Sequence, residues 1–149
     1  MPYENLTEKN SDGSLTVVAT AFCMVSHDVQ VSVAPIFLVE QSFPENNHYL
    51  WLYHVTIENQ RSHQIQILTR YWHIVDAYGK IQEVRGDGVV GQQPIIKPGK
   101  SYEYVSSIPL TTPSGLMRGL YHGRANKQDL EIVIPTFSLD SPYQSATHH

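Results

Sequence analysis

Apolar and polar residues alternate along most of the chain with a period of two, the spacing of a half-buried β-strand. The clearest segment is 49–58, where aromatic and β-branched residues hold one parity. No window of a dozen residues shows the helical period of about 3.6, and prolines interrupt any helical interpretation. Strands are predicted over 29–33, 49–58, 65–76, 81–85, 101–107, 116–122 and 130–134.

Turn-forming residues separate these segments. The clearest turns are 59–62, 77–80 and 97–100, the last with proline at its second position. About seven antiparallel strands joined in this way predict an all-β fold, a β-sandwich of two layers. Trp72 lies in the middle of a predicted strand, and we expect it in the core between the sheets.

The two ends of the chain differ in composition from the part between them. Residues 1–14 are mostly polar, and the residues after Pro142 carry no strand pattern. We therefore expect a loosely ordered N-terminal extension over 1–26, a sandwich domain over 27–142, and a C-terminal tail over 143–149.

Charge and cysteine content narrow the functional classes. The net charge is −4 with 16% charged residues and no basic run, which predicts no nucleic-acid partner and no attraction to anionic membranes. The apolar run 15–25 is too short to cross a bilayer, and acidic residues precede it where a signal peptide carries basic ones. A single cysteine, Cys23, suits a reducing compartment, so we expect a cytoplasmic protein.

A glycine-rich stretch is the most distinctive motif. Gly86, Gly88 and Gly91 fit the pattern G-x-G-x-x-G of dinucleotide-binding folds. That fingerprint requires a helix after the third glycine, and proline-containing segments follow here instead, so no nucleotide cofactor is expected. Two interpretations remain: a corner between strands, or a loop whose main-chain N–H groups bind an anion beside Arg85.

The eight histidines predict no metal site, because no chelating pattern is present. His48 and His54 share a strand parity, but six residues of extended chain separate them by about 20 Å. No nucleophile with a base and no pair of convergent carboxylates can be identified, so no catalytic residue is predicted and we expect a protein that is not an enzyme.

Longer motifs identify a family. In order along the chain they read QSFPENNHYLWLYHVTIEN, LTRYWHIVDAYGKIQEVRGDGVVGQQPIIKPG, YEYVSSIPLTTPSGLMRGLY and IPTFSLDSP. They resemble the ApaG family (DUF525 domain), in its stand-alone bacterial form, over about residues 27–142. The resemblance implies an immunoglobulin-like or fibronectin type III-like β-sandwich. It also implies a link to cobalt and magnesium homeostasis and binding of pyrophosphate-type ligands by the glycine motif.

Together these observations lead to one expected function and one alternative. We expect a binding protein that holds pyrophosphate or a related phosphate ligand through Arg85, Gly86, Gly88 and Gly91. The alternative is an adaptor that binds a protein partner through a sheet face or edge and takes no small molecule. The sequence does not predict the oligomeric state.

Overall fold

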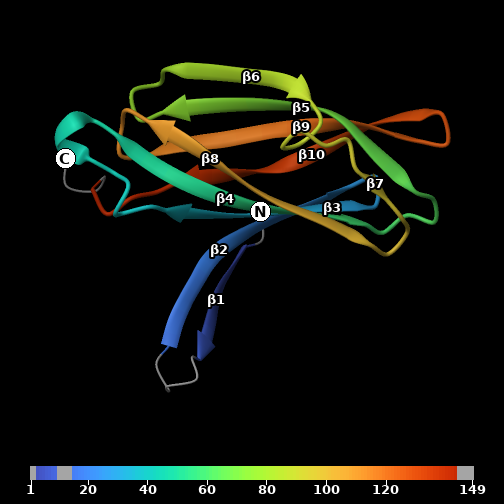
Figure 1. The fold of residues 1–149 in the computed structure, drawn as a ribbon, viewed down its shortest axis with the longest axis horizontal. Helices are drawn as coiled ribbons and strands as arrows, with labels where there is room; N and C mark the ends of the chain where they lie inside the picture. The colour runs from blue at the N-terminus through green and yellow to red at the C-terminus, as the bar shows by residue number, and fades with distance from the viewer. Residues whose placement is uncertain (1–2, 10–14, 144–149) are drawn as a thin grey trace.

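Two antiparallel sheets pack face to face in the computed structural model, which describes residues 3–9 and 15–143, with side chains from residue 21 onward (Figure 1). One sheet has the strand order β1-β2-β3-β4-β8, and the other has the order β10-β9-β5-β6 with β7 paired to β5. The strands are β1 (Tyr3–Lys9), β2 (Leu15–Ser26), β3 (Val29–Phe37), β4 (Tyr49–Asn59), β5 (Ile65–Asp76), β6 (Ile81–Asp87), β7 (Ile95–Ile96), β8 (Ser101–Leu110), β9 (Gly115–Ala125) and β10 (Gln128–Leu139).

The predicted fold class is confirmed as an all-β sandwich of antiparallel strands. Each of the seven predicted segments is a strand, and β5 has the predicted bounds. The structure adds β1, β2 and the short β7, together with a single turn of 3-10 helix at Pro44–Asn46. Periodicity did not reveal these elements because β2 is apolar on both parities over much of its length and β7 has two residues.

The N-terminal segment differs from the expectation of a loose extension up to residue 26. Residues 22–26 of β2 pair with β3, from Phe22 opposite Val33 to Ser26 opposite Val29. The Phe22 ring lies 6.2 Å from that of Phe137, and the Ser26 hydroxyl accepts the N–H of Val133 at 2.9 Å. The sandwich therefore begins before the predicted boundary, because these residues cover one side of β10.

Aromatic side chains form the centre of the core. Trp72 is 3% exposed, as predicted, and its ring lies 5.4 Å from Tyr53 and 6.0 Å from Phe137. Along β4, buried and half-buried residues alternate over the whole strand. Burying one large apolar side chain contributes about 1.5–3 kcal/mol, so this cluster holds the sheets together without a disulfide.

The segment after Gly91 is not helical. Ile96 of β7 pairs with Ile65 of β5 in the place where a dinucleotide-binding fold begins a helix. The prediction against that fold is therefore confirmed. In the described residues, no helix is long and apolar enough to span a membrane.

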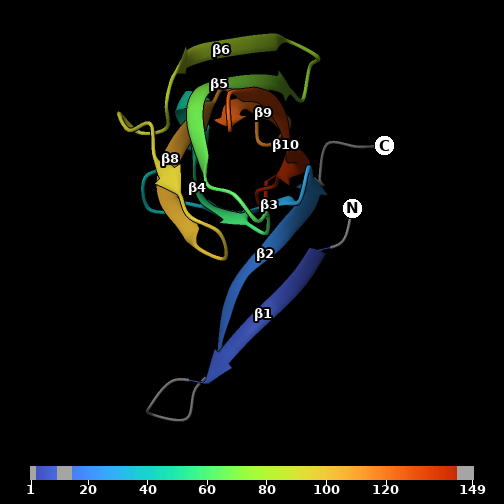
Figure 2. The same ribbon diagram turned by 90° about the vertical axis from the view of Figure 1, so that its right-hand side faces the viewer.

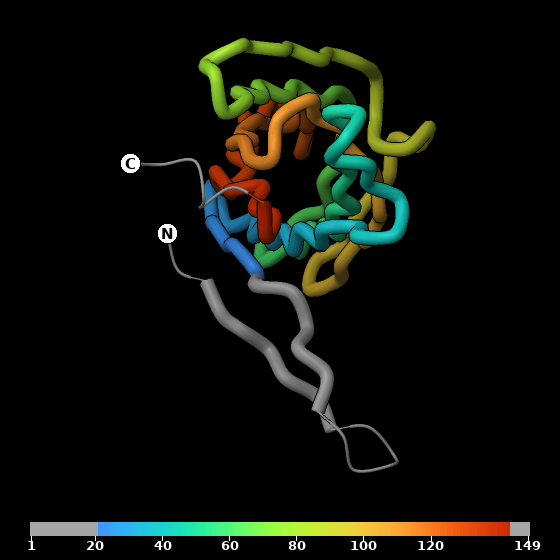
Figure 3. The backbone as a smooth tube through the Cα atoms, turned by 90° about the vertical axis from the view of Figure 1, so that its left-hand side faces the viewer, coloured from blue at the N-terminus to red at the C-terminus, as the bar shows by residue number. Residues whose placement is uncertain are grey.

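The two long sides of the sandwich are closed to different extents. On one side β10 contacts β2 and β3. On the other side β6 and β8 are the edge strands of their sheets. The end-on views show β6 as the outermost strand of its layer (Figure 2, Figure 3). The glycine motif lies at the end of β6, on this second side.

Candidate functional site

A tight turn forms the tip of the glycine-rich loop. Val89 and Gln92 exchange both main-chain hydrogen bonds, with N–H to oxygen distances of 2.7 and 3.0 Å. Between them Val90 has φ 47° and Gly91 has φ 77°. Two successive positive φ values define a type I′ turn, which favours glycine, asparagine or aspartate at these positions. Gly91 meets this need, and Val90 holds a conformation that β-branched residues rarely adopt.

Gly88 is required by its surroundings. Its φ is 62°, and a Cβ at this position would lie 2.1 Å from the main-chain oxygen of Gln92. Its N–H donates to the oxygen of Leu68 at 2.7 Å. Any side chain here would collide with the main chain that closes the turn.

Gly86 makes room for an arginine from the neighbouring strand. A Cβ at Gly86 would lie 2.8 Å from Nη1 of Arg70. That nitrogen donates to the main-chain oxygens of Asp87 and Gly88, at 2.9 and 3.1 Å. Arg70 therefore fastens the start of the loop to β5, and the absence of a side chain at Gly86 permits it.

These contacts use many of the main-chain N–H groups that were expected to bind an anion. The N–H groups of Gly88, Val89 and Gln92 donate within the protein. In the part of the chain that the structure describes, the N–H groups of Val90 and Gly91 have no partner. The glycines thus have structural explanations, and at most the tip of the loop offers free donors.

Arg85 lies on the other face of the sheet from Arg70. Arg70 is opposite Gly86 and Tyr71 is opposite Arg85, and successive side chains of a strand point to opposite faces. The Arg85 guanidinium lies 4.6 Å from the centre of the Tyr71 ring. Its side chain is 71% exposed, and Nη2 is 3.8 Å from Oε2 of Glu83, a loose ion pair.

Tyr71 connects Arg85 with further polar residues on this outer face. The Tyr71 hydroxyl donates to Oε2 of Glu83 at 2.6 Å, which raises the pKa of Tyr71 and lowers the pKa of Glu83. The charges of Arg85 and Arg118 both act to lower the pKa of Tyr71, and Arg118 lines a hollow together with Tyr71. Arg118 in turn donates from Nε to Nδ1 of His73 at 3.4 Å. We call Tyr71, Glu83, Arg85 and Arg118 the Tyr71 cluster.

Two shallow hollows meet at Tyr71. One extends from Tyr71 toward Arg85 and Asp87, with Gly86 also in its lining. The other extends toward Arg118 and the strand β10. The outer face of β5, β6 and β9 therefore offers two arginines around one aromatic ring, each beside an open hollow.

The predicted site residues are only partly brought together. Arg85 and Gly86 line the same hollow, whereas Gly88 and Gly91 shape the turn beyond it. The prediction missed Tyr71 and Arg118. Register was the missing information, because these residues are far apart in sequence and only the pairing of β5 with β6 and β9 places them beside Arg85.

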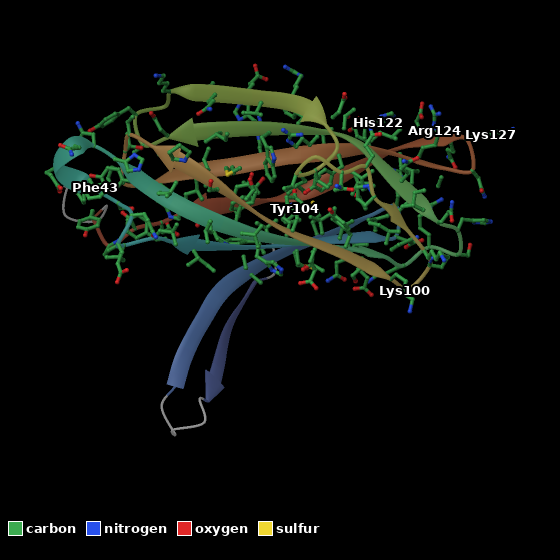
Figure 4. All side chains as sticks on the ribbon, in the orientation of Figure 1. Phe43, Lys100, Tyr104, His122, Arg124 and Lys127 are labelled. Atoms are coloured by element: carbon green, nitrogen blue, oxygen red, sulfur yellow. The ribbon has the colours of Figure 1, made fainter. Side chains whose placement is uncertain are left out.

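A second polar group lies inside the sandwich. The hydroxyls of Tyr104 and Tyr121 form a short hydrogen bond, and Tyr104 points into the space between the sheets (Figure 4). Burial raises the pKa of both hydroxyls, and it also raises the pKa of the Tyr53 hydroxyl. The charge of Arg70 acts against this effect at all three tyrosines. These phenols are therefore neutral hydrogen-bonding groups of the core.

Two histidines in the described residues lie beside a carboxylate. His54 Nε2 lies 2.8 Å from Glu103, and His122 Nε2 lies 3.4 Å from Asp129, which also accepts from Arg124. His122 and Arg124 lie side by side on β9 (Figure 4). No group of three histidine, cysteine, aspartate or glutamate side chains suited to a metal ion occurs within residues 21–143.

Comparison with known proteins gives the family. The model of the ApaG domain (DUF525) matches residues 39–125. The chain belongs to the ApaG family. Protein ApaG of Brucella canis is 50% identical to it over 127 residues, 85% of this chain and 98% of the relative. Protein ApaG of Paramagnetospirillum magneticum is 47% identical over 124 residues, 83% of this chain and 95% of the relative.

A similar sandwich fold has also been determined by crystallography. The crystal structure of an ApaA protein from Bordetella pertussis matches with a TM-score of 0.75 at 45% identity. The match covers 78% of this chain and 95% of that one. The two proteins therefore share this sandwich fold. The matched region of the ApaG domain contains the glycine-rich loop and the whole Tyr71 cluster.

Proposed function

We propose that this protein is a non-enzymatic binding module whose ligand is a small anion of the phosphate class, with pyrophosphate the first candidate. The ligand binds at the outer face of β5 and β6, at Arg85 and the hollow beside it. Arg85 and Gly86 line this site, and Gly88 and Gly91 fix the turn that follows it. At the tip of the described loop, the N–H groups of Val90 and Gly91 have no protein partner and are exposed.

The observation that carries this proposal is the position of the Arg85 guanidinium. It lies over the Tyr71 ring, is largely exposed, and makes only a 3.8 Å ion pair. A guanidinium fork grips two oxygens of a phosphate group at once. Arg118, which lines a hollow together with Tyr71, supplies a second positive charge. The second phosphate group of pyrophosphate can use this charge, which acetate cannot.

The proposal includes a link to cobalt and magnesium homeostasis that needs no metal site on the protein. Pyrophosphate oxygens are hard ligands, which suit magnesium. A phosphate-class ligand therefore carries a divalent cation with it. This form of the link agrees with the absence of a metal-binding cluster among residues 21–143.

Titration calorimetry with pyrophosphate tests the proposal. We expect binding that weakens with added salt and is stronger than binding of acetate. Arg85→Ala should abolish it. Arg124→Ala is the matched control, because Arg124 is an exposed arginine of the same sheet that already pairs with Asp129 at 3.1 Å. Absence of binding at millimolar pyrophosphate, or equal binding by Arg85→Ala, would refute the site.

A second candidate function is that of a protein-binding adaptor, favoured by the outer face of the other sheet. Ile36 is 45% exposed and Val105 is 50% exposed there. Ile36 pairs with Leu52 across β3 and β4. Exposed apolar residues grouped on one face are typical of protein interaction sites.

A pull-down from the native host with mass spectrometry tests the adaptor function. The wild-type protein should retain a partner that an Ile36→Lys variant loses, because a charge placed in the apolar face must be desolvated on binding. Ile81→Lys is the control, since Ile81 is equally an exposed isoleucine but lies on the other sheet. A partner retained by both variants would exclude this face.

A further inference from the structure

Strand β6 is a free edge with no covering element in the described structure. It ends the sheet order β10-β9-β5-β6, and only Val84 and Gly86 of its seven residues are partly shielded from solvent. Nothing lies beyond it in the end-on view (Figure 2). Natural edge strands are commonly protected by proline, a bulge or charged side chains. Ile81–Asp87 contains neither proline nor a bulge, and its charged residues alternate in sign, so an antiparallel partner can complement them.

The hydrogen bonds of β5 show which main-chain groups of β6 are available. The Asp76 N–H donates to the main-chain oxygen of Lys80 at 3.0 Å, and the Gly88 N–H donates to that of Leu68 at 2.7 Å. At both ends of the ladder, the residue on the β6 side whose main chain faces β5 therefore has an even number. Hydrogen-bonded and non-hydrogen-bonded pairs alternate along an antiparallel ladder. The odd-numbered residues of β6 therefore turn their N–H and C=O groups to the open edge.

We propose that this edge pairs with β6 of a second copy of the same chain. The two strands run antiparallel about a two-fold axis at Val84. This register pairs the strand over its full length and sets Glu83 opposite Arg85 of the partner subunit, and Arg85 opposite Glu83 of the partner subunit. The main chain of both residues faces the edge, so each pair exchanges two hydrogen bonds, about four in all.

Charge complementarity selects this register. A two-fold axis at Glu83 would place two carboxylates directly opposite each other, and an axis at Arg85 would place two guanidinium groups opposite each other. Opposite charges in facing positions stabilise a strand pair, and like charges destabilise it. The order of acid, apolar residue and base in Glu83-Val84-Arg85 is thus self-complementary, as a two-fold interface requires.

The neighbours of the axis also fit. Val84 is partly buried against the core, and the pairing covers the rest of it with Val84 of the partner subunit. Gln82 comes opposite Gly86 of the partner subunit, where no side chain competes for space. The carbonyl of Asp87 accepts from Arg70 at 2.9 Å, so the inter-subunit ladder ends there.

A single strand pair makes a small contact. A stable interface usually buries about 1,200 Å² or more, and two seven-residue strands bury less. We therefore expect a reversible dimer that depends on protein concentration and weakens with salt, because the charged pairs are exposed.

Sedimentation equilibrium of the full chain, from micromolar to millimolar concentration, tests the dimer. Glu83→Arg and Arg85→Glu should each raise the dissociation constant by about tenfold or more, since each puts like charges opposite each other. The double variant Glu83→Arg/Arg85→Glu should restore dimerisation. Lys100→Glu is the control for a change in net charge away from β6, and circular dichroism checks that every variant is folded.

Cysteine cross-linking tests the register independently, in a Cys23→Ser background. Facing Cα atoms in a non-hydrogen-bonded pair lie about 4.5 Å apart, within the range of a disulfide. Val84→Cys should therefore form a covalent dimer on oxidation, whereas Gln82→Cys should not, because its copies lie away from the axis. A monomer at all concentrations, failure of the double variant to restore the dimer, or equal cross-linking of both cysteine variants would overturn the proposal.

The dimer does not depend on the phosphate ligand. The double charge swap retains the dimer but moves the guanidinium from position 85, so it should lose pyrophosphate binding. If the wild-type chain dimerises but does not bind pyrophosphate, the dimer proposal holds and only the proposed ligand is refuted.

Discussion

Arg70 and Arg85 occupy adjacent rungs of the same ladder, on opposite faces of the sheet. Arg70 is half-buried and donates to two main-chain oxygens of the glycine-rich loop. Arg85 is exposed and stacks on Tyr71. Arg70 therefore stabilises the fold and Arg85 is available to a ligand, although the two residues are of the same type.

This difference changes the meaning of the glycine motif. In the sequence, three glycines beside an arginine suggest a loop that cradles an anion. In the structure, Gly86 accommodates the inward arginine and Gly88 accommodates the turn. The glycines thus make room for Arg70 and for the turn, whereas Arg85 on the other face is the residue available to bind a ligand.

The largest effect on stability is expected at Gly88. Gly88→Ala should destabilise the protein by about 3 kcal/mol or more, because its Cβ would meet a main-chain oxygen at 2.1 Å in addition to the positive φ. Gly91→Ala is the matched control. It has a positive φ but open space around it, and should cost only about 1–2 kcal/mol. Urea unfolding of both variants measures the difference.

Similar losses in the two variants would contradict the packing explanation for Gly88. Total stability of a domain is about 5–15 kcal/mol, so both variants should remain folded enough to measure. If both glycines act only through their backbone conformation, the loop is a simple corner, and its contact with Gln92 has no energetic role.

Periodicity located seven of the strands but did not predict which residues of β5 face the core. The buried residues Ile65 and Ile67 have odd numbers, whereas Trp72 and Ile74 have even numbers. The parity changes at a bulge against β9, between Ile67 and Thr69. A bulge inserts one residue into the alternation, and no residue type at this point announces it.

The same bulge decides which arginine faces inward. Counting from Ile65 places position 70 outside, and counting from Trp72 places it inside. The chemistry of the Tyr71 cluster follows from this choice, together with the register against β6 and β9. Both are properties of strand pairing, so the sequence predicted Arg85 as a site residue but could not supply its neighbours.

Removal of each arginine should separate their roles. Arg70→Ala should cost about 2–3 kcal/mol, since it removes charge-assisted hydrogen bonds and leaves two carbonyls without their donor. Arg85→Ala should leave the urea midpoint unchanged, because an exposed loose ion pair contributes little. Amide hydrogen exchange should show faster exchange at residues 88–92 in Arg70→Ala alone.

Faster exchange of that loop in Arg85→Ala would contradict the division of roles. Pyrophosphate titration gives the reverse comparison. If Arg70→Ala stays folded, it should still bind pyrophosphate, with a lower affinity if the loop has moved. Arg85→Ala should lose pyrophosphate binding.

The smallest effect is a coupling between Gly86 and Arg70, and it tests the comparison most directly. Gly86→Ala alone should cost about 1 kcal/mol, because the new Cβ displaces the end of a flexible side chain rather than main chain. In the Arg70→Ala background the same substitution meets no guanidinium, and alanine is less costly than glycine in a strand by about 0.5–1 kcal/mol. Gly86→Ala should then be neutral or stabilising. A double-mutant cycle by urea unfolding therefore predicts a coupling of about 1 kcal/mol or more between the two positions. Additive effects would mean that Gly86 serves something other than Arg70, and an anion bound by its main chain would again become the simplest explanation for that glycine.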